Sequence, residues 1–400
     1  MDAEGKILIP ARGRPQVSPP AMDSAQVPRC LLKCRRDGVL RKEDFGVSMD
    51  FVGVVCPREK IVEVLSLLQT APSICNTLPR ISCVVETAEK EKAILLAHTI
   101  RSPEEIPPDR KTRLDSLGLK TIQHTVTLGY KHWKFAEVVD AILPAGLKRI
   151  ASFECAGRIA HLNLEREHLP FRHTIGKILL EKTPNIKTVL NKTAKIENKF
   201  RVLPMEILAG SNDTVVRAKE NDCVFVFDYA TVYWNSRLQR EHYRLVSSFK
   251  PGEVVCDVFC GVGPFAIPAA KRGCTVYAND LNPHAYAALL ENSRRNKVTA
   301  NIHCYCLDGA EFIEKIDRLG KEEGFTVAHY VLNLPQSSCG FLGLFATPSQ
   351  STVHVYLFAG CVREAEEAVQ TAIGREMGGK KTAHVRRVSP KTVMYCVSFQ

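Results

Sequence analysis

The sequence lacks the patterns that would place it in a membrane or outside the cell. No apolar run in its 400 residues approaches the roughly 18 that a membrane-spanning helix needs. The N-terminus has no apolar core of a secretory signal. Its 15 cysteines include no C-x-x-C pair and are scattered through apolar segments, which favours reduced thiols over disulfides. We expect an intracellular protein that does not contact a membrane and holds no metal.

The charge of the chain indicates the kind of partner it binds, and its length indicates how many domains it forms. Lysine and arginine total 54 against 43 aspartates and glutamates, a formal net charge of +11 that suits a phosphate-rich partner. Four hundred residues with 45% hydrophobic content exceed what one core supports, so we expect several domains. The compartment stays open between cytoplasm, nucleus and mitochondrial matrix, because the basic N-terminal segment also carries Asp2 and Glu4.

Changes in composition along the chain predict four segments. Residues 1–27 are interpreted as a flexible tail or a targeting segment, and 28–110 as a small α+β domain ending in a proline-rich linker over 102–109. Residues 111–222 form a basic middle α+β domain, and 223–400 a separate α/β domain. In the middle domain, basic and apolar residues interleave over 166–201, which predicts a folded element with a basic face suited to an RNA backbone.

Beyond residue 222, short β-rich apolar runs alternate with helical patterns, as in a doubly wound parallel sheet. The predicted strands are 254–259, 275–280, 301–307, 326–332, 353–359, 382–388 and 393–399, with helices that include 283–297 and 361–374. The last two strands follow each other without a helix, so the final strand is expected to run antiparallel. This pattern fits the seven-stranded class I methyltransferase sheet better than a six-stranded dinucleotide-binding fold.

A turn with two glycines follows the first predicted strand of this sheet. Gly261 and Gly263 let the backbone approach a ligand at the carboxyl edge of the sheet, where such folds bind cofactors. Ala266 replaces the third glycine of a dinucleotide fingerprint, which disfavours an oxidoreductase. The acidic Asp257 before the turn suits a sulfonium better than a pyrophosphate.

Polar residues also end the next three strands. Asp280, followed by Leu281, can accept hydrogen bonds from both hydroxyls of a ribose. Asp308, followed by Gly309, can take an adenine amino group, and Asn333 ends the fourth strand. Each aspartate alone is more often a helix N-cap. Because suitable groups end four successive strands, we expect S-adenosyl-L-methionine as the cofactor.

Seven stretches carry a resemblance to a known family: 152–164, 191–192, 200–210, 232–242, 257–265, 280–283 and 333–335. Over roughly residues 120–400 the chain resembles the eukaryotic and archaeal tRNA guanine-N1 methyltransferases, which act on the guanosine 3′ of the anticodon at position 37. The first three stretches lie outside any general methyltransferase core. The resemblance implies tRNA with guanosine at position 37 as the substrate, an activity that supports reading-frame maintenance, a monomer, and an N-terminal domain that touches the outer corner of the tRNA.

The resemblance also implies roles for individual residues. Guanine N1 carries a proton at neutral pH, so its methylation needs a base, and a cation or donor at O6. Glu241 occupies the position of the base and Arg201 that of the O6 cation. Asn333 is implied to bind the purine edge, Tyr233 to position the base and His242 to contact the cofactor. The target base must leave its stack to reach the methyl group.

Two alternatives stay open. A sister family transfers an aminocarboxypropyl group from the same cofactor in wybutosine synthesis, and the run 333–335 favours methyl transfer because the sister family resembles Asn-Leu-Gly there. A non-catalytic tRNA-binding relative would have lost Glu241, Arg201 or the glycine turn. One departure from the family concerns Gln336 and Ser337, which follow Pro335 where a small residue is usual, so the shape of the base pocket there is open.

Overall fold

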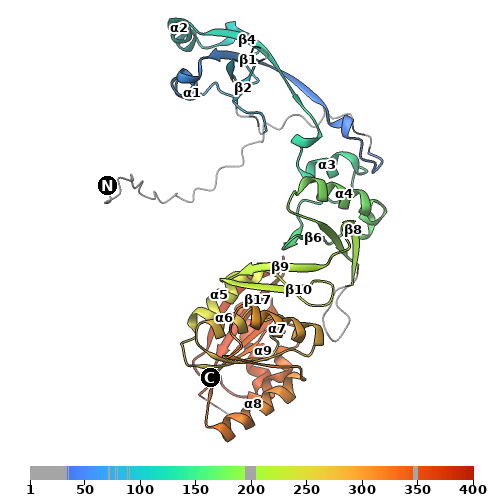
Figure 1. Cartoon of the computed structure of the whole chain (residues 1–400), viewed down its shortest axis with the longest axis vertical. Coiled ribbons are helices and arrows are strands. Elements are labelled where there is room, and N and C mark those ends of the chain that lie inside the picture. Colours follow the sequence, from blue (N-terminus) through green and yellow to red (C-terminus); the bar gives the residue numbers. More distant parts are fainter. Residues whose placement is uncertain are drawn as a thin grey trace, which may run out of the picture. The chain divides into compact units, whose positions relative to one another are not determined.

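The computed structural model describes residues 34, 36–70, 73–76, 78, 80–87, 89, 91–193, 204–345 and 350–400. The chain divides into two compact units, Met1–Ala145 and Gly146–Gln400 (Figure 1). All cysteines in the described ranges are free thiols, as expected. Short 3-10 turns join the larger elements: η2 (Lys42–Phe45), η3 (Arg58–Lys60), η4 (Pro103–Glu105), η5 (Tyr130–His132), η6 (Arg166–Phe171), η7 (Ser236–Leu238) and η8 (Ser338–Phe345).

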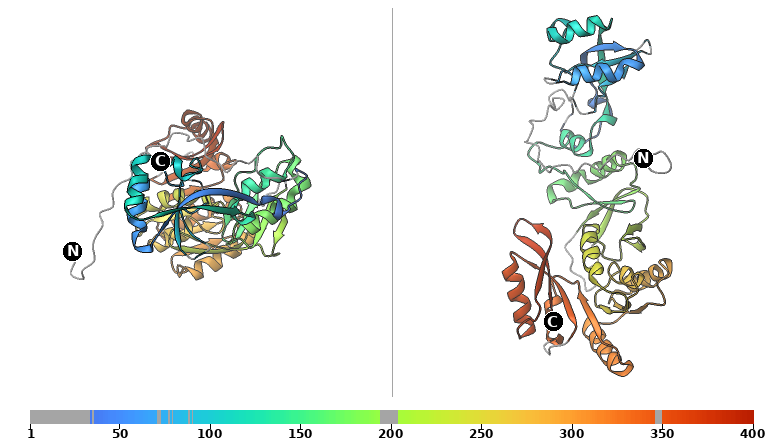
Figure 2. Two further views of the ribbon diagram at one scale, coloured as in Figure 1. Left: turned by 90° about the horizontal axis from the view of Figure 1, so that it is seen from above. Right: turned by 90° about the vertical axis from the view of Figure 1, so that its left-hand side faces the viewer.

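The first unit is built on a four-stranded antiparallel sheet with the strand order β2-β3-β1-β4. Its elements are β1 (Val47–Cys56), α1 (Ile61–Gln69), β2 (Val84–Glu86), β3 (Lys92–Leu95), α2 (Pro108–Ser116), β4 (Lys120–Leu128) and α3 (Phe135–Ile142). Val52 and Val54 alternate along β1 and pack in one core with Leu68 of α1 and Leu114 of α2. The long pairing of β1 with β4 can be followed in Figure 2.

Two predictions about this unit need correction. The stretch 102–109 is not a structureless linker, because η4 lies within it and α2 begins at Pro108. Proline is tolerated in the first helical turn, where its missing N–H has no partner to lose. The domain boundary at residue 110 is also displaced, since β4 pairs with β1 from Val47↔Leu128 to Val55↔Lys120 and the unit continues to Ala145. Composition does not reveal this pairing between distant segments.

The second unit begins with a small sheet of order β5-β6-β7-β8. Its elements are β5 (Glu154–Ala156), β6 (Ile159–Leu162), α4 (Arg172–Lys182), β7 (Thr188–Lys192) and β8 (Met205–Gly210). Helix α4 lies close to β8 because Gly176 has no side chain: a Cβ there would lie 2.5 Å from the Cβ of Leu208. A folded element is confirmed over 166–193, and the remainder of the predicted basic stretch up to 201 includes residues outside the described ranges.

A hairpin joins this sheet to the C-terminal part of the unit. Strands β9 (Val215–Glu220) and β10 (Cys223–Asp228) pair antiparallel, and Asn221 and Asp222 make their turn with positive φ angles. Phe225 and Phe227 belong to the same buried cluster as the helices of the C-terminal sheet. The predicted boundary at 222 therefore falls in the turn of a hairpin, and the segments on either side of it share one core.

The C-terminal sheet has seven strands in the order β13-β12-β11-β14-β15-β17-β16. They are β11 (Val254–Asp257), β12 (Thr275–Asn279), β13 (Ile302–Tyr305), β14 (Val327–Leu332), β15 (Thr352–Ala359), β16 (Lys381–Ser389) and β17 (Thr392–Phe399). Neighbours among β11 to β15 pair parallel, whereas β17 runs antiparallel to both β15 and β16. The seven predicted strands and the antiparallel last strand are confirmed.

Helices cover both faces of this sheet (Figure 1). They are α5 (Gln239–Ser248), α6 (Ala266–Lys271) and α7 (Pro283–Arg295) on one face, and α8 (Gly309–Glu323) and α9 (Val362–Ile373) on the other. Successive residues of β11 point to opposite faces, so Val255 packs in the first cluster and Cys256 in the second. This double cover leaves the carboxyl edge of the strands as the place for a ligand.

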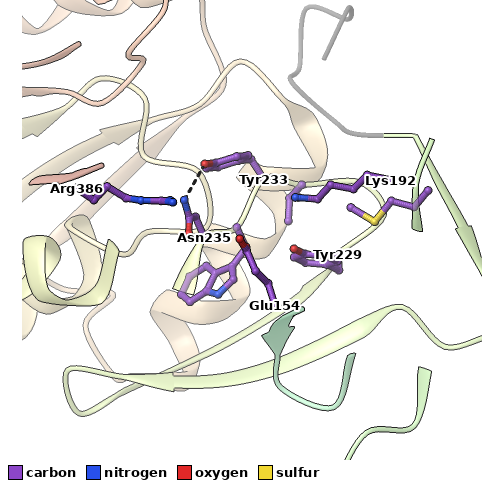
Figure 3. Close-up of a pocket in the computed structure, with 9 residues that line it drawn as sticks. Glu154, Lys192, Tyr229, Tyr233, Asn235 and Arg386 are labelled. Carbon is purple, nitrogen blue, oxygen red and sulfur yellow. Dashed lines mark hydrogen bonds between the residues drawn. The ribbon is translucent and has the colours of Figure 1, made fainter. Parts of the chain in front are cut away.

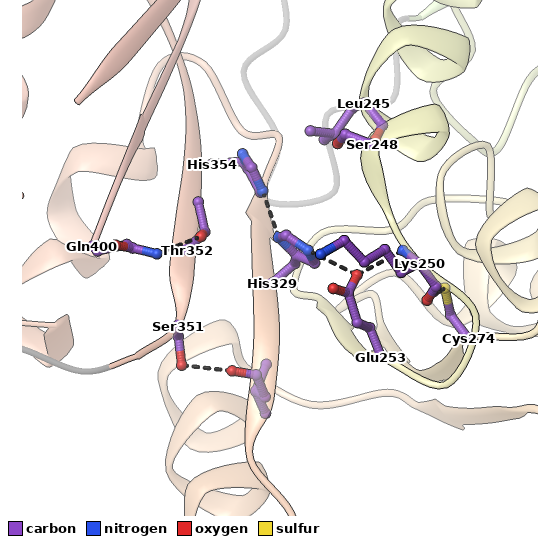
Figure 4. Close-up of polar contacts among 11 residues, drawn as sticks. Leu245, Ser248, Lys250, Glu253, Cys274, His329, Ser351, Thr352, His354 and Gln400 are labelled. Carbon is purple, nitrogen blue, oxygen red and sulfur yellow. Dashed lines mark hydrogen bonds and ion pairs between the residues drawn. The ribbon is translucent and has the colours of Figure 1, made fainter. Parts of the chain in front are cut away.

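A pair of histidines, His354 buried and His329 half-buried, crosses from β14 to β15 (Figure 4). His329 Nδ1 lies 3.1 Å from His354 Nε2, and His354 Nδ1 lies 2.8 Å from the Ser398 hydroxyl. His329 Nε2 lies 3.2 Å from a Glu253 carboxylate oxygen. Burial lowers the pKa of His354 from 6.5 to about 3, helped by the nearby charges of His329 and Arg244. Burial also lowers the pKa of His329, while Glu253 opposes the shift.

We expect this pair to make the unit less stable in acid. The pKa of His354 is lower in the folded chain than in the unfolded one, so below about pH 6.5 the unfolded state binds the extra proton. The free energy of unfolding should fall by up to about 1.4 kcal/mol per pH unit from this group. Denaturant unfolding at pH 7 and at pH 5 measures this change. Between the two pH values, the free energy of unfolding of wild type should fall by about 2 kcal/mol more than that of His354→Asn. Equal losses would contradict this expectation.

Candidate active site

A cavity of about 310 Å³ opens at the carboxyl edge of the seven-stranded sheet. Parallel strands bring their ends to one edge, and most of the predicted residues meet there. Those that line the cavity are Tyr233, His242, Gly261, Asp280, Leu281, Asp308, Gly309 and Asn333. Three others, Glu241, Asp257 and Gly263, do not line it, and Arg201 lies outside the described residues.

The glycine turn forms one wall of the cavity. Gly261 has a φ of +55° and open space where a Cβ would be, so a ligand can approach its backbone closely. Gly263 has a φ of +96° and lies behind the wall, where a Cβ would come within 2.8 Å of Ile267 and Leu289. The first glycine exposes backbone to the cavity, and the second allows α6 and α7 to pack against the turn.

Asp280 is fixed in the cavity wall by two backbone N–H groups. Gly261 N donates to one of its carboxylate oxygens at 2.8 Å, and Asn282 N donates to the other at 2.9 Å. Burial raises the pKa of Asp280, whereas these two hydrogen bonds lower it. Each oxygen of a carboxylate keeps a further lone pair, so Asp280 can accept two hydroxyl groups from a ligand in the cavity.

Asp257 lies beneath the turn and is fully buried. Neither carboxylate oxygen has a hydrogen-bond partner of ordinary geometry among the described residues. Burial raises the pKa of Asp257 well above its usual range, and the charge of Asp280 acts in the same direction. A buried carboxylate without partners favours a positive charge nearby. S-adenosylmethionine carries such a charge, and the residues present therefore fit this cofactor.

Aromatic rings form the apolar wall beside Asp308. The rings of Phe259 and Phe341 meet edge to face, 5.0 Å apart, and a Cβ at Gly309 would lie 2.8 Å from Phe259. Asp308 itself caps α8, because its Oδ1 accepts a hydrogen bond from Ala310 N at 2.9 Å. The aromatic wall can hold a flat ring such as adenine. Asp308 also caps a helix, which is the commonest role of an aspartate at the end of a strand.

His242 lines the cavity from α5 and is held by a partner that sequence reasoning missed. Its Nδ1 contacts a carboxylate oxygen of Glu220 on β9, and both side chains are buried. The ring also packs edge to face on Phe265 at 4.6 Å between centroids. Glu220 precedes His242 by 22 residues at the end of β9, and the chain folds back between them through the hairpin of β9 and β10.

Glu241 is buried on the same helix with 6% of its surface exposed. Arg244 donates to both carboxylate oxygens, at 2.7 and 2.6 Å, and the hydroxyl of Tyr356 donates at 2.7 Å. Glu241 therefore contacts the sheet strand β15 and its own helix, and lines neither this cavity nor the smaller one beside it. A role as the base requires its carboxylate to turn away from Arg244.

Comparisons with known proteins identify the family. The TRM5/TYW2 methyltransferase domain matches residues 214–371, and the TYW2 N-terminal domain matches 135–214. A tRNA (guanine(37)-N(1))-methyltransferase of Phytophthora infestans is 39% identical over 386 residues, which cover 90% of this chain and 92% of that protein. The enzyme of the same name from Homo sapiens is 35% identical over 375 residues, covering 87% and 73%. The chain belongs to the tRNA (guanine(37)-N(1))-methyltransferase family.

Solved structures agree with the family on the fold. Trm5b from Pyrococcus abyssi is 22% identical and superposes with a TM-score of 0.64, covering 88% of this chain and 99% of that one. A structure described as a complex of aTrm5 and tRNALeu has a TM-score of 0.65 at 19% identity, covering 87% and 99%. In the described ranges of this family member, no helix is both long and apolar enough to cross a membrane, and no cluster of His, Cys, Asp or Glu suits a metal ion.

A second, polar cavity of about 150 Å³ adjoins the first in this family member (Figure 3). The two cavities share Tyr233, Trp234, Asn235 and Arg386 in their walls. Glu154, Lys192 and Tyr229 are among the other residues that line the smaller one. Sequence reasoning assigned no role to these three or to Arg386. The signal available was that Glu154 and Lys192 lie within the stretches that carry the family resemblance.

Proposed function

We propose that this chain transfers the methyl group of S-adenosyl-L-methionine to N1 of the guanosine at position 37 of tRNA. The observation that carries this proposal is the meeting of two cavities of different chemistry at Tyr233, Trp234, Asn235 and Arg386. The larger has acidic and aromatic walls that fit the cofactor, and the smaller has charged walls that fit the edge of a base. Relatives named for this activity, and one structure described with tRNALeu, support tRNA as the substrate.

The cofactor cavity binds and orients the methyl donor. When bound, S-adenosylmethionine supplies an electrophilic methyl group. Asp280 would accept hydrogen bonds from the two ribose hydroxyls, and Gly261 leaves its backbone open to the ligand. Phe259 and Phe341, which line the cavity, would hold the adenine and exclude water from it. Asp257, buried below the turn, would become negatively charged when the sulfonium is bound, because a nearby cation lowers the pKa of a buried carboxyl.

The chain's other residues act on the base. Glu241 takes the proton from guanine N1 after its carboxylate leaves Arg244. Arg201 donates to O6 as negative charge develops there. Asn333 lies at the end of β14 in the cofactor cavity and donates to the purine edge, while the half-exposed ring of Tyr233 positions the base where the two cavities meet. We propose further that the enzyme acts as a monomer, in the cytoplasm, nucleus or mitochondrial matrix.

The competing activity is transfer of the aminocarboxypropyl group in wybutosine synthesis, and the matched family description names TRM5 and TYW2 together. The two reactions are separated by the position of the label in S-adenosylmethionine. Cofactor labelled in the methyl group should label tRNA, and cofactor labelled in the carboxyl group should not. Label transferred from the carboxyl position alone would establish the competing activity instead.

A further inference from the structure

Charged and polar groups converge on the smaller cavity from elements far apart in the sequence (Figure 3). Glu154 comes from β5, Lys192 from the end of β7 and Tyr229 from the segment after β10. Glu154 and Lys192 carry opposite charges, yet no ion pair within 4 Å joins them in the part of the chain that the structure describes. The two charges instead lie on the wall of the same space.

The carboxylate of Glu154 is held in one orientation by its neighbours. Arg237 Nη2 lies 2.8 Å from one oxygen, and His161 Nε2 lies 3.4 Å from the other. His161 is buried, and its Nδ1 lies 2.8 Å from the Tyr229 hydroxyl, which fixes the ring. The hydrogen bond to His161, together with the charges of His161, Arg237 and Lys192, lowers the pKa of Glu154 to about 2. Glu154 is thus a weak base and a permanent hydrogen-bond acceptor with free lone pairs.

Guanine presents three groups on its Watson–Crick edge: the acceptor O6, the N1 position and the donor 2-amino group. The lone pair that guanine N1 uses as a methyl acceptor lies in the plane of the ring, so no side chain can remain in front of N1. The protein can hold the base only at the two flanking groups. A fixed acceptor on the cavity wall fits the 2-amino group, and a cation on the same wall fits O6.

We propose that Glu154 determines specificity by accepting a hydrogen bond from the 2-amino group of the target guanine, with Lys192 as a second donor to O6, whose two lone pairs also accommodate the proposed contact with Arg201. The inference rests on the proposed function and adds the recognition of one functional group to it. Glu154 acts on binding and orientation and takes no proton. Inosine differs from guanosine only in lacking the 2-amino group, so it reports on this contact alone.

The experiment compares kcat/KM for tRNA transcripts that carry guanosine or inosine at position 37. For wild type, kcat/KM should be about 10- to 100-fold higher with guanosine than with inosine, since the loss of one buried polar contact has an effect of this size. In Glu154→Ala, kcat/KM should fall by about 10- to 100-fold for the guanosine transcript and by less than about 3-fold for the inosine transcript. Glu154→Gln, which keeps the side-chain volume, should shift the preference in the same direction. Glu367→Ala, an exposed glutamate on α9, should change neither value.

Other outcomes overturn the inference in distinguishable ways. Equal losses on both transcripts would mean that Glu154 only positions Arg237 and His161. A wild type without preference, or a variant that keeps the wild-type preference, would also overturn it. Unchanged melting temperatures and cofactor affinities would show that the variants fold. If wild type binds the cofactor but methylates neither transcript, the proposed function itself fails.

Discussion

Replacing Glu241 by glutamine is expected to lower kcat for methyl transfer by about 100- to 10,000-fold, the range typical of a lost general base. The glutamine keeps the shape of the side chain but cannot take the N1 proton. Cofactor affinity should not change, because Glu241 does not line the cofactor cavity. The measurement is single-turnover transfer to saturating tRNA, with cofactor binding determined by calorimetry.

Tyr356→Phe is the matched control for this prediction. It removes the hydrogen bond from Tyr356 to Glu241 and leaves the carboxylate and Arg244 in place. Because the carboxylate must leave its structural partners to act, this variant should retain kcat within a few-fold while losing about 1 kcal/mol of stability. A Glu241→Gln enzyme with wild-type kcat and only a lower melting temperature would reduce Glu241 to a structural partner of Arg244 and Tyr356.

Asp280→Asn is expected to weaken binding of S-adenosylmethionine by about 100-fold or more. The carboxylate accepts hydrogen bonds from Gly261 N and Asn282 N and, in our proposal, from two ribose hydroxyls. An amide has one acceptor oxygen, so it cannot serve all four donors, and hydrogen bonds to a charged group are worth about 1.5–3 kcal/mol each. Calorimetric titration with the cofactor measures the effect directly.

Asp213→Asn is the control for the cofactor prediction. Asp213 also accepts a backbone N–H, from Val215 at 2.9 Å, but it is exposed and lies outside both cavities. Its replacement should leave cofactor affinity unchanged. If the two variants bound the cofactor as tightly as wild type does, the assignment of the larger cavity to S-adenosylmethionine would be wrong.

The parts of the fold that follow from local pattern could be predicted from the sequence. Apolar runs bounded by turns predicted the strands β11, β12, β14, β15 and β17, because a sheet covered on both faces makes nearly continuous apolar strands. The glycine turn and Asp280 could also be predicted, since parallel strands bring their carboxyl ends to one edge. These inferences need only the spacing of residues along the chain.

The parts that depend on contacts between distant segments could not be predicted. Strand β4 was assigned to the wrong domain because its partner β1 lies far away in the sequence. The smaller, polar cavity could not be predicted because two residues of its wall, Glu154 and Arg386, come from opposite ends of the second unit. The orientation of Glu241 was equally hidden, since helix position alone does not say whether a side chain meets a cavity or a neighbour such as Tyr356.

The central claim is tested most directly by incubating the full chain with methyl-labelled S-adenosylmethionine and two tRNA transcripts that differ only in guanosine or adenosine at position 37. The modified nucleoside is then identified by its mass. The account predicts 1-methylguanosine from the guanosine transcript alone. Label in another nucleoside, equal label in both transcripts, or no transfer despite measurable cofactor binding would contradict it.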